Sequence, residues 1–479
     1  MGVLRSIRLL VWGEAPTNPV EAKLLFKMDW FILSFICLVY WSNYLNRANF
    51  ASAYTSGLRE YAELKGNEFN KINTLFTVGY VVGLIPNNLI LLKVKANYWM
   101  SFCCLCWGLM TLGLFKSSHY YQFCIIRFFQ GIFESVTFTG SHLLLSRWYT
   151  ETEITKRSAI FTSSGLIGNM FSSFMQAAIH TNMDGKQGLH GFQWLFIIDF
   201  VITVPIALYG FLFFPNTPET CTARYFTTEE LELAKKRVVP PEHTKIDLSL
   251  IKRVLGRWHF WCLSMLWVWF GENESFGTNS LLALYLTYFD YSITHRNTYI
   301  LGLYGVGIIS TFLCGLYVDG TGARYHYRVG IYICIVLLIS AIMILVNPLN
   351  HSVAMAAYYL SGVSYSGQAT FFAWANIICA DDLPERAVVL ASMNMFSNAV
   401  NAWWSLLFYG ADTAPKFRKG AIAMICTVFA GLAVALLTRY LQLRDEKKVI
   451  TEEGSIESTN VSVDKNAVEF KTNEVSSET

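Results

Sequence analysis

Two charged residues, Arg127 and Glu134, lie seven positions apart inside the apolar segment FCIIRFFQGIFESVTFTG. Seven residues make nearly two turns of an α-helix, so both side chains project from one face, roughly 10 Å apart along the axis. A charged side chain inside a membrane helix costs several kcal/mol, and such residues usually face a bundle interior or a wet cavity. The pair therefore indicates a water-accessible pathway through an otherwise apolar chain.

Glu134 is the candidate for carrying a proton along that pathway, with Arg127 as its partner. Burial disfavours the charged form of a carboxylate, so Glu134 can gain and lose a proton at its expected mid-membrane position. Helical side chains lean toward the amino terminus, which tips Glu134 toward Arg127 but Arg127 away from it. We therefore expect a pair that forms or breaks with protonation rather than a constant bridge. A static structural ion pair is the alternative.

A second cationic residue, Arg47, closes the segment YWSNYLNRANF. Its planar guanidinium suits a carboxylate substrate. Tyr44 lies one helical turn earlier on nearly the same face and adds a hydroxyl group. We predict that both bind substrate, and the alternative is an arginine that extends to the membrane surface.

Two further carboxylates, Glu272 and Glu274, occur in WVWFGENESFGTNS. They are two residues apart, about 200° around a helix, so they face one cavity only if the helix unwinds there. Gly271 and Gly277 would permit such unwinding. We expect one of the two carboxylates to reach the cavity, and the spacing does not select which.

Amide side chains complete the predicted substrate site, namely Gln368, Asn394 and Asn398. Asn394, Asn398 and Asn401 follow i, i+4, i+7 spacing and form one polar stripe on a helix. Hydrogen bonding between helices explains such amides about as well as substrate contact does. Both interpretations remain open at this point.

All these residues lie in apolar stretches of about 20 residues, the length that crosses a bilayer as a helix. Apolar residues make up 53% of the chain and charged residues 15%, against about 25% charged in soluble domains. The sequence therefore predicts an all-α membrane protein with twelve transmembrane helices. The stretches are residues 28–46, 71–92, 97–115, 120–145, 158–180, 193–214, 258–286, 298–318, 328–346, 352–379, 387–410 and 419–441.

The stretches fall into two sets of six, which predicts two pseudo-repeated bundles with a substrate site between them. A Thr-capped surface helix is expected at TTEELELAKKR in the central loop. The polar tail, poor in aromatic residues, is expected to be disordered. The predicted parts are an arm (1–27), a first bundle (28–214), a central loop (215–257), a second bundle (258–441) and a tail (442–479).

Lysine and arginine set the predicted orientation. They gather in the arm, at Arg5, Arg8, Lys23 and Lys27, and in the central loop, which carries eight more. Because loops rich in Lys and Arg stay in the cytoplasm, we expect both termini and the central loop to be cytoplasmic.

Several classes of function are not expected. The sequence shows no nucleotide-binding loop, zinc motif or hydrolase triad, which disfavours an enzyme, an ATP-driven pump and a cofactor. The cluster Cys103, Cys104 and Cys106 has no nearby His or carboxylate, so we expect no metal site. The net charge of +3 reflects the loop bias and gives no reason to propose nucleic acid. We expect a monomer in the lipid bilayer.

Four segments carry a resemblance to a known family: YLNRANF, RFFQGIFES, QWLFIIDF and FFPNTPET. They resemble the fungal allantoate permease family, a branch of the anion:cation symporters in the major facilitator superfamily, and the resemblance covers 26–441. The segments NTLFTVGYVVGLIPNNLILL, RSAIFTSSGLIGNMFSSFMQ and FFAWANIICADDLPERAVVLASMNMFSNAVNAWWS are most similar to the pantothenate:proton symporters of this family.

The resemblance implies a plasma-membrane protein that imports pantothenate with protons by alternating access. Biotin, nicotinate and allantoate are alternative substrates within the branch, and a nutrient sensor that transports little is an alternative function.

The resemblance also implies roles for individual residues. In relatives, a first-span arginine binds the substrate carboxylate, which here is Arg47. A fourth-span arginine and glutamate are coupled to proton movement, here Arg127 and Glu134. Many relatives have an aspartate just before the first-span arginine, where this chain has Asn46. An amide takes up no proton, so either Glu134 alone carries the proton or the stoichiometry differs.

Overall fold

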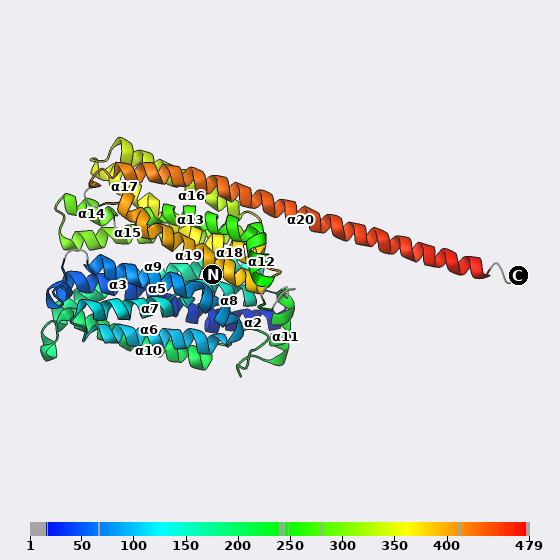
Figure 1. Ribbon diagram of the computed structural model, residues 1–479, viewed down its shortest axis with the longest axis horizontal. Helices are drawn as coiled ribbons and strands as arrows, with labels where there is room; N and C mark the ends of the chain where they lie inside the picture. The colour runs from blue at the N-terminus through cyan, green and yellow to red at the C-terminus, as the bar shows by residue number, and fades with distance from the viewer. Residues whose placement is uncertain are drawn as a thin grey trace, which may run out of the picture.

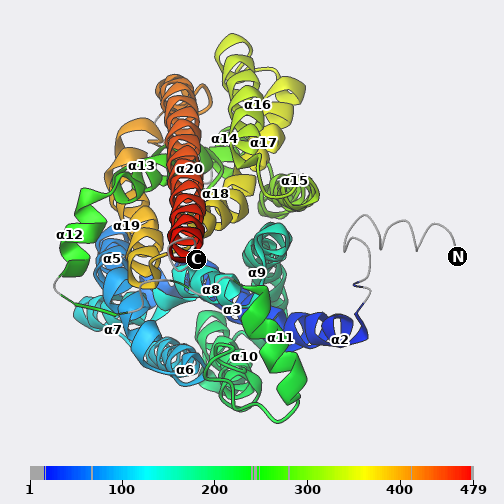
Figure 2. The ribbon, with the colours of Figure 1, turned by 90° about the vertical axis from the view of Figure 1, so that its right-hand side faces the viewer.

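The computed structural model describes residues 16, 18–65, 68–238, 241, 245–247, 249–278, 281–410 and 413–475, and nearly all of them lie in helices. In Figure 1 the helices run alongside one another, with the first half of the chain (blue to cyan) beneath the second half (green to red). Figure 2 looks along the helices and shows the two halves meeting at a shared boundary.

The first half begins with a long, nearly continuous helix from Pro19 to Tyr61, kinked where Gly57 has a φ of +106°. It extends beyond the predicted stretch 28–46 at both ends, because hydropathy marks only the part that crosses the apolar layer. The elements of this half are α2 (Pro19–Met28), η1 (Asp29–Leu33), α3 (Ser34–Ala53), η2 (Tyr54–Leu58), α4 (Arg59–Tyr61), α5 (Glu68–Lys93), α6 (Ala96–Leu114), α7 (Tyr120–Glu134), α8 (Val136–Trp148), α9 (Glu151–Met183), η3 (Lys186–Gly188) and α10 (Gly191–Phe213).

The second half follows the central segment, which contains the short helices α11 (Thr228–Arg237) and α12 (Ser249–Gly256). Its elements are α13 (Trp258–Thr278), α14 (Leu281–Tyr288), α15 (Ile293–Gly320), α16 (His326–Val346), α17 (His351–Ser361), η4 (Gly362–Tyr365), α18 (Ser366–Ile378), α19 (Leu383–Phe408) and α20 (Arg418–Val475).

Each predicted apolar stretch falls on one of these helices or on a run of consecutive ones and passes the helix ends by at most two residues, whereas several helices extend well beyond the stretch. By length and hydropathy alone, five helical segments among the described residues are long and apolar enough to cross a membrane. They are Glu68–Lys93, Gly191–Phe213, Thr298–Gly320, His326–Val346 and Arg418–Lys448.

The two halves repeat one packing scheme. In the first half α3 packs against α9, α6 against α10 and α5 against α7. In the second half α13 packs against α19, α16 against α20 and α15 against α18, which are the corresponding positions in helix order. The halves meet where α5 packs against α19 and α9 against α15. This correspondence fits an internal repeat, whose interface is where a substrate site is expected.

Glycine permits a very close crossing of α5 and α7. A Cβ atom added to Gly131 would lie 2.2 Å from the carbonyl oxygen of Phe76, and one added to Gly79 would lie 2.1 Å from the carbonyl oxygen of Phe128. Backbone atoms cannot move aside as a flexible side chain can, so small residues are required where the two helices meet.

Gly131→Ala is therefore expected to lower the apparent melting temperature of the detergent-solubilised protein. The added methyl group must push two helix backbones apart, and overpacking of this kind costs about 1–3 kcal/mol. Gly305→Ala is the matched control, because nothing lies within 4 Å of an added Cβ at that position. Equal melting temperatures for the two variants would contradict the close crossing.

The predicted Thr-capped helix of the central loop is confirmed as α11, whose first turn is capped by Thr227 Oγ1 accepting from Glu230 N at 3.2 Å. Lys27 Nζ of α2 donates to the Glu230 carboxylate at 2.7 Å. Burial alone would raise the pKa of Glu230, but hydrogen bonds from Lys27 and from the Thr227 backbone lower the pKa below its ordinary value. At the other end of α11, Arg237 pairs with Glu153 of α9. The central segment thus fastens α2 to the start of α9.

The end of the molecule that holds α2, α11 and α12 lies on the right in Figure 1, and we call it the α11 end.

The structure differs at this end from the sequence prediction of a disordered tail at 442–479. Instead, α20 continues to Val475 and projects beyond the bundles (Figure 1). A helix makes its backbone hydrogen bonds within itself, so it can extend without a core to pack against. Arg5 and Arg8, which contribute to the predicted orientation, lie outside the described residues.

Candidate functional site

A cavity of about 290 Å³ lies between the two halves. The first half contributes lining side chains from α3, α5, α8 and α9, and the second half contributes them from α13, α15, η4, α18 and α19. The volume is near the lower end of the roughly 300–1,000 Å³ of small-molecule pockets. Tyrosine and amide side chains dominate the lining, so the cavity offers many neutral hydrogen-bonding groups around few charges.

An ion pair joins α3 to α7 at the wall of this cavity. Arg47 Nε donates to Glu134 Oε2 at 3.0 Å. Asn43 Nδ2 donates to the same oxygen at 3.0 Å. The Glu134 side chain is completely buried, whereas 30% of the Arg47 side chain is exposed and lines the cavity. A ligand in the cavity can therefore reach the guanidinium, while the carboxylate lies behind it.

Aromatic rings hold the Arg47 guanidinium at the cavity wall. Its Cζ lies 4.6 Å from the ring centroid of Tyr80, 5.2 Å from that of Phe76 and 6.0 Å from that of Tyr44. The faces of aromatic rings attract cations. These rings therefore help to keep the cation in place when its carboxylate partner changes.

The predicted amide stripe of α19 faces the cavity, because Asn394, Asn398 and Asn401 all line it. Asn394 Nδ2 donates to Tyr80 OH at 3.0 Å, which joins the two halves. Asn398 Nδ2 donates to Asn394 Oδ1 at 2.9 Å. The stripe thus makes contacts between helices and also presents polar atoms to the cavity.

Glu274 lines the cavity and Glu272 does not. α13 is a continuous helix here, so the two side chains point in different directions, and neither Gly271 nor Gly277 unwinds it. Gln368 Nε2 donates to Glu274 Oε1 at 2.6 Å. Glu272 is completely buried. Of the two carboxylates that the sequence spacing could not distinguish, Glu274 is therefore the one that lines the cavity.

Two tyrosines of α3 in the first half extend the polar lining formed by Glu274 and Gln368. Tyr40 OH lies 3.2 Å from Tyr44 OH and 3.4 Å from Gln368 Oε1. With these contacts the structure brings all five predicted substrate-binding residues to one cavity. They are Arg47, Tyr44, Gln368, Asn394 and Asn398.

Arg127 is not a direct partner of Glu134. Its Nη1 donates to Gln130 Oε1 at 2.8 Å, and its Cζ lies 4.2 Å from the Phe76 ring and 4.4 Å from the Phe50 ring. The expectation that Arg127 and Glu134 form no constant bridge agrees with this geometry. The partner of Glu134 is Arg47, which helical spacing within α7 could not reveal.

Asn46 faces the interior of the first half. It accepts from Gln130 Nε2 at 2.5 Å and donates to Thr111 Oγ1. Gln130 also accepts from Arg127, so a chain of polar contacts links Arg127 to Asn46. Both the oxygen and the nitrogen of the Asn46 amide are therefore engaged in hydrogen bonds.

Sequence reasoning missed several groups. Asp199 of α10 is completely buried and accepts from Asn49 Nδ2 at 2.9 Å. The sequence feature that could have identified Asp199 is its position as a lone carboxylate in the apolar segment QWLFIIDF. The cavity-lining residues that were missed include tyrosines, which carry no signal within apolar stretches. The tyrosines are Tyr40, Tyr80, Tyr304 and Tyr365, and the other missed lining residues are Phe138, Asn169, Trp267, Thr278 and Ser397.

Polar contacts between the halves close the structure on the α11 side of the cavity. Side chains of α5, α18 and α19 donate across the boundary, and Asp319 of α15 accepts from two backbone N–H groups in the second turn of α9. The contacts are Asn88 to Ala387 O, Asn376 to His142 O and Arg386 to Ser146 Oγ, each at 3.0 Å, and Thr155 N and Lys156 N to Asp319 at 3.2 and 2.9 Å. Asn376 thus fits the alternative role of an amide that joins helices.

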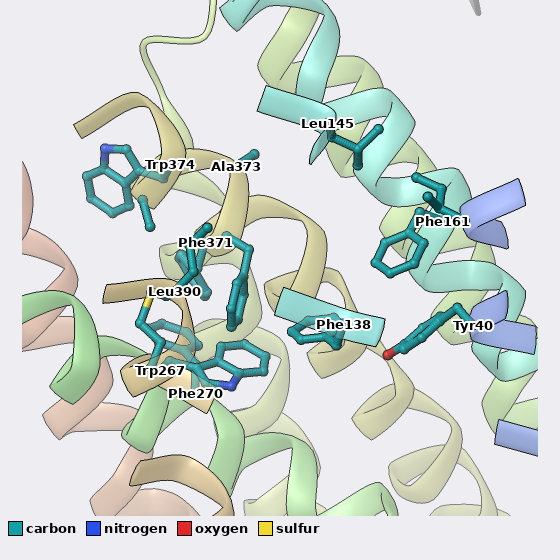
Figure 3. Packing of buried hydrophobic residues seen from close by; sticks show 14 of the residues in the cluster. Tyr40, Phe138, Leu145, Phe161, Trp267, Phe270, Phe371, Ala373, Trp374 and Leu390 are labelled. Carbon is teal, nitrogen blue, oxygen red and sulfur yellow. The ribbon is translucent and has the colours of Figure 1, made fainter. Parts of the chain in front are cut away.

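Aromatic packing reinforces this closure beside the cavity. Figure 3 shows Phe138 of α8 between Tyr40 of α3 and Trp267 of α13. The Phe138 ring centroid lies 5.6 Å from that of Tyr40 and 4.7 Å from that of Phe372 in α18. Trp267 lies 5.2 Å from Phe372. An apolar layer therefore separates the cavity from the contacts at the α11 end.

One group among the described residues has the spacing of metal ligands: His259, Cys379 and Glu385, whose ligand atoms lie within 4.8 Å of one another. Its carboxylate is already engaged, since Glu385 pairs with His259 Nδ1 at 2.9 Å and with Arg257. The carboxylate oxygens of Glu385 are thus taken up by an arginine and a histidine.

Comparison with known proteins identifies the fold. The model of the Major Facilitator Superfamily matches residues 36–405. The chain is 49% identical over 431 residues to "Pantothenate transporter FEN2" of Saccharomyces cerevisiae, which covers 88% of this chain and 84% of that protein. It is 38% identical over 432 residues to "Pantothenate transporter liz1" of Schizosaccharomyces pombe, which covers 90% of this chain and 84% of that protein.

A solved structure with the same arrangement of helices is that of the proton:xylose symporter XylE bound to 6-bromo-6-deoxy-D-glucose. It has a TM-score of 0.67 and 11% sequence identity, and the match covers 87% of this chain and 95% of that chain. The predicted all-α fold is confirmed, and with it a multi-pass membrane protein. This chain belongs to the major facilitator superfamily.

Proposed function

We propose that this chain imports pantothenate with protons across the plasma membrane, as a member of the fungal allantoate permease branch. The observation that carries the proposal is the ion pair between Arg47 and the buried Glu134 at the wall of the inter-half cavity. The names of the two fungal relatives supply the substrate. Pantothenate has one carboxylate, two hydroxyl groups and an amide, which suit one arginine surrounded by tyrosine, asparagine and glutamine side chains.

Competition for Arg47 supplies the coupling mechanism. While Glu134 is ionised it occupies the guanidinium, and a substrate carboxylate has to displace it. A proton on Glu134 removes its negative charge, and the substrate carboxylate is then the anion that pairs with Arg47. Proton uptake and anion binding thereby favour each other, which is the requirement for symport.

The orientation follows from the basic residues of the central segment. Lys235, Lys236, Arg237 and Arg253 lie on α11 and α12, so the α11 end is cytoplasmic if positively charged loops stay inside. The contacts between the halves close the cytoplasmic end, so substrate would enter the cavity from the outer side. Rocking of the two halves about the cavity would break these contacts and open the site to the cytoplasm.

The test is uptake of labelled pantothenate into yeast cells that lack their own carrier. We expect saturable uptake that an acidic medium stimulates. An excess of unlabelled pantothenate should compete, whereas biotin, nicotinate and allantoate should compete weakly. No uptake above that of cells with an empty vector, despite surface expression, would contradict the proposal. Strong competition by biotin or nicotinate would reassign the substrate.

A further inference from the structure

Among the described residues, the cavity lining carries one cation, Arg47, and one carboxylate, Glu274, and the buried Glu134 pairs with Arg47 from behind the wall. Glu134 already neutralises the charge of Arg47. Glu274 adds a carboxylate from the opposite half. If both carboxylates were ionised, the three groups would sum to one negative charge before substrate arrives and to two after an anion binds. An uncompensated negative charge is strongly disfavoured in a poorly solvated cavity.

Glu274 is a buried carboxylate with a neutral partner. Only 7% of the residue is exposed. Its Oε1 accepts from the uncharged amide of Gln368 at 2.6 Å, and its Oε2 has no hydrogen-bond partner within the described part of the chain. The same part of the chain offers it no ion pair within 4 Å. Nothing in its surroundings therefore balances a charge on Glu274 in the way that Arg47 balances Glu134.

The titratable and charged groups around Glu274 come from several elements. α3 contributes tyrosines and Arg47, α15 and η4 contribute one tyrosine each, and α18 and α19 present amides and a serine. These groups are Tyr40, Tyr44, Tyr80, Tyr304, Tyr365 and Arg47 around the cavity, and Glu272 on α13 itself. Tyrosines are neutral at physiological pH, and Arg47 is engaged by Glu134 or by substrate. A proton is then the remaining means of neutralising Glu274.

We infer that Glu274 is a second proton site, so that two protons accompany each anion and each cycle carries one net positive charge inward. Both protons enter from the outer side with the substrate, one on Glu134 and one on Glu274, and both leave to the inner side with it. The inference rests on the proposed function. It differs from one-proton coupling in a measurable way, because one proton with one anion moves no net charge.

The experiment uses purified protein in liposomes at equal pH on both sides, with valinomycin and a potassium gradient to set an inside-negative potential. With one net charge per cycle, a tenfold potassium gradient should raise the equilibrium accumulation ratio of pantothenate by about tenfold. Glu274→Gln should still accumulate pantothenate under a pH gradient but should lose the response to potassium. Glu272→Gln is the matched control, since that carboxylate lies two residues away and does not line the cavity, and it should respond like the wild type.

A wild-type accumulation ratio that does not change with the potassium gradient would overturn the inference, whatever the variants do. So would a Glu274→Gln variant with the wild-type response. Glu274→Asp keeps a titratable carboxylate and should respond to the potassium gradient as the wild type does. This variant keeps the test decisive where Glu274→Gln yields little folded protein, because loss of the response in Glu274→Asp would also contradict the inference. If the wild type takes up no pantothenate under either gradient, the proposed function fails instead.

Discussion

Arg47→Ala is expected to reduce pantothenate uptake at low substrate concentration by about 10- to 100-fold, since hydrogen bonds to charged groups contribute about 1.5–3 kcal/mol and 1.4 kcal/mol is a factor of ten. The substitution removes the cation that lines the cavity and leaves Glu134 buried without its ionic partner. The measurement is initial uptake of labelled pantothenate, corrected for the amount of protein at the cell surface.

Two variants separate loss of the binding group from loss of folded protein. Arg47→Lys keeps the positive charge but not the planar fork, so it should retain part of the uptake. Arg444→Ala removes an arginine whose side chain is 44% exposed, far from the cavity lining, and should behave like the wild type. Normal uptake by Arg47→Ala would remove this residue from the substrate site.

Glu134→Gln is expected to lose net accumulation of pantothenate while it keeps exchange of internal for external substrate. The empty carrier of this variant has no anion to neutralise Arg47, so it must change conformation with an unpaired, largely buried cation at the cavity wall. Breaking a buried pair by removing one partner costs about 3–5 kcal/mol, which slows the empty return step by more than about 100-fold. Exchange avoids this step, because substrate neutralises Arg47 in both directions.

The measurement for this variant is the ratio of net uptake to exchange in liposomes with a pH gradient. Glu134→Asp keeps a titratable group on the same helix, so it should recover part of the net uptake. Net accumulation at the wild-type level in Glu134→Gln would show that the proton assigned to Glu134 binds elsewhere.

Much of the architecture could be predicted from local sequence. Apolar stretches located the helices because their length and composition are properties of each segment alone. The stripe of Asn394, Asn398 and Asn401 was also visible, since helical periodicity places these residues on one face whatever packs against it. The cap at Thr227 is a similarly local feature.

The partners in the site could not be predicted in this way. Glu134 pairs with Arg47 rather than with Arg127, because the packing of α3 near α7 decides the contact and helix spacing within α7 does not. Which of Glu272 and Glu274 lines the cavity depends on the rotation of α13 about its own axis. The spacing of two residues along the helix does not determine that rotation. Both outcomes depend on contacts between segments far apart in the sequence.

The central claim is that Glu134 and the substrate carboxylate compete for Arg47, and pantothenate binding as a function of pH tests it most directly. Dissociation constants should be measured for purified wild-type protein and for Glu134→Gln across a range of pH. Loss of one linked proton should make the wild-type dissociation constant rise by up to about tenfold more per pH unit than that of the variant, as Glu134 ionises. Equal pH dependence in the two proteins would contradict the competition.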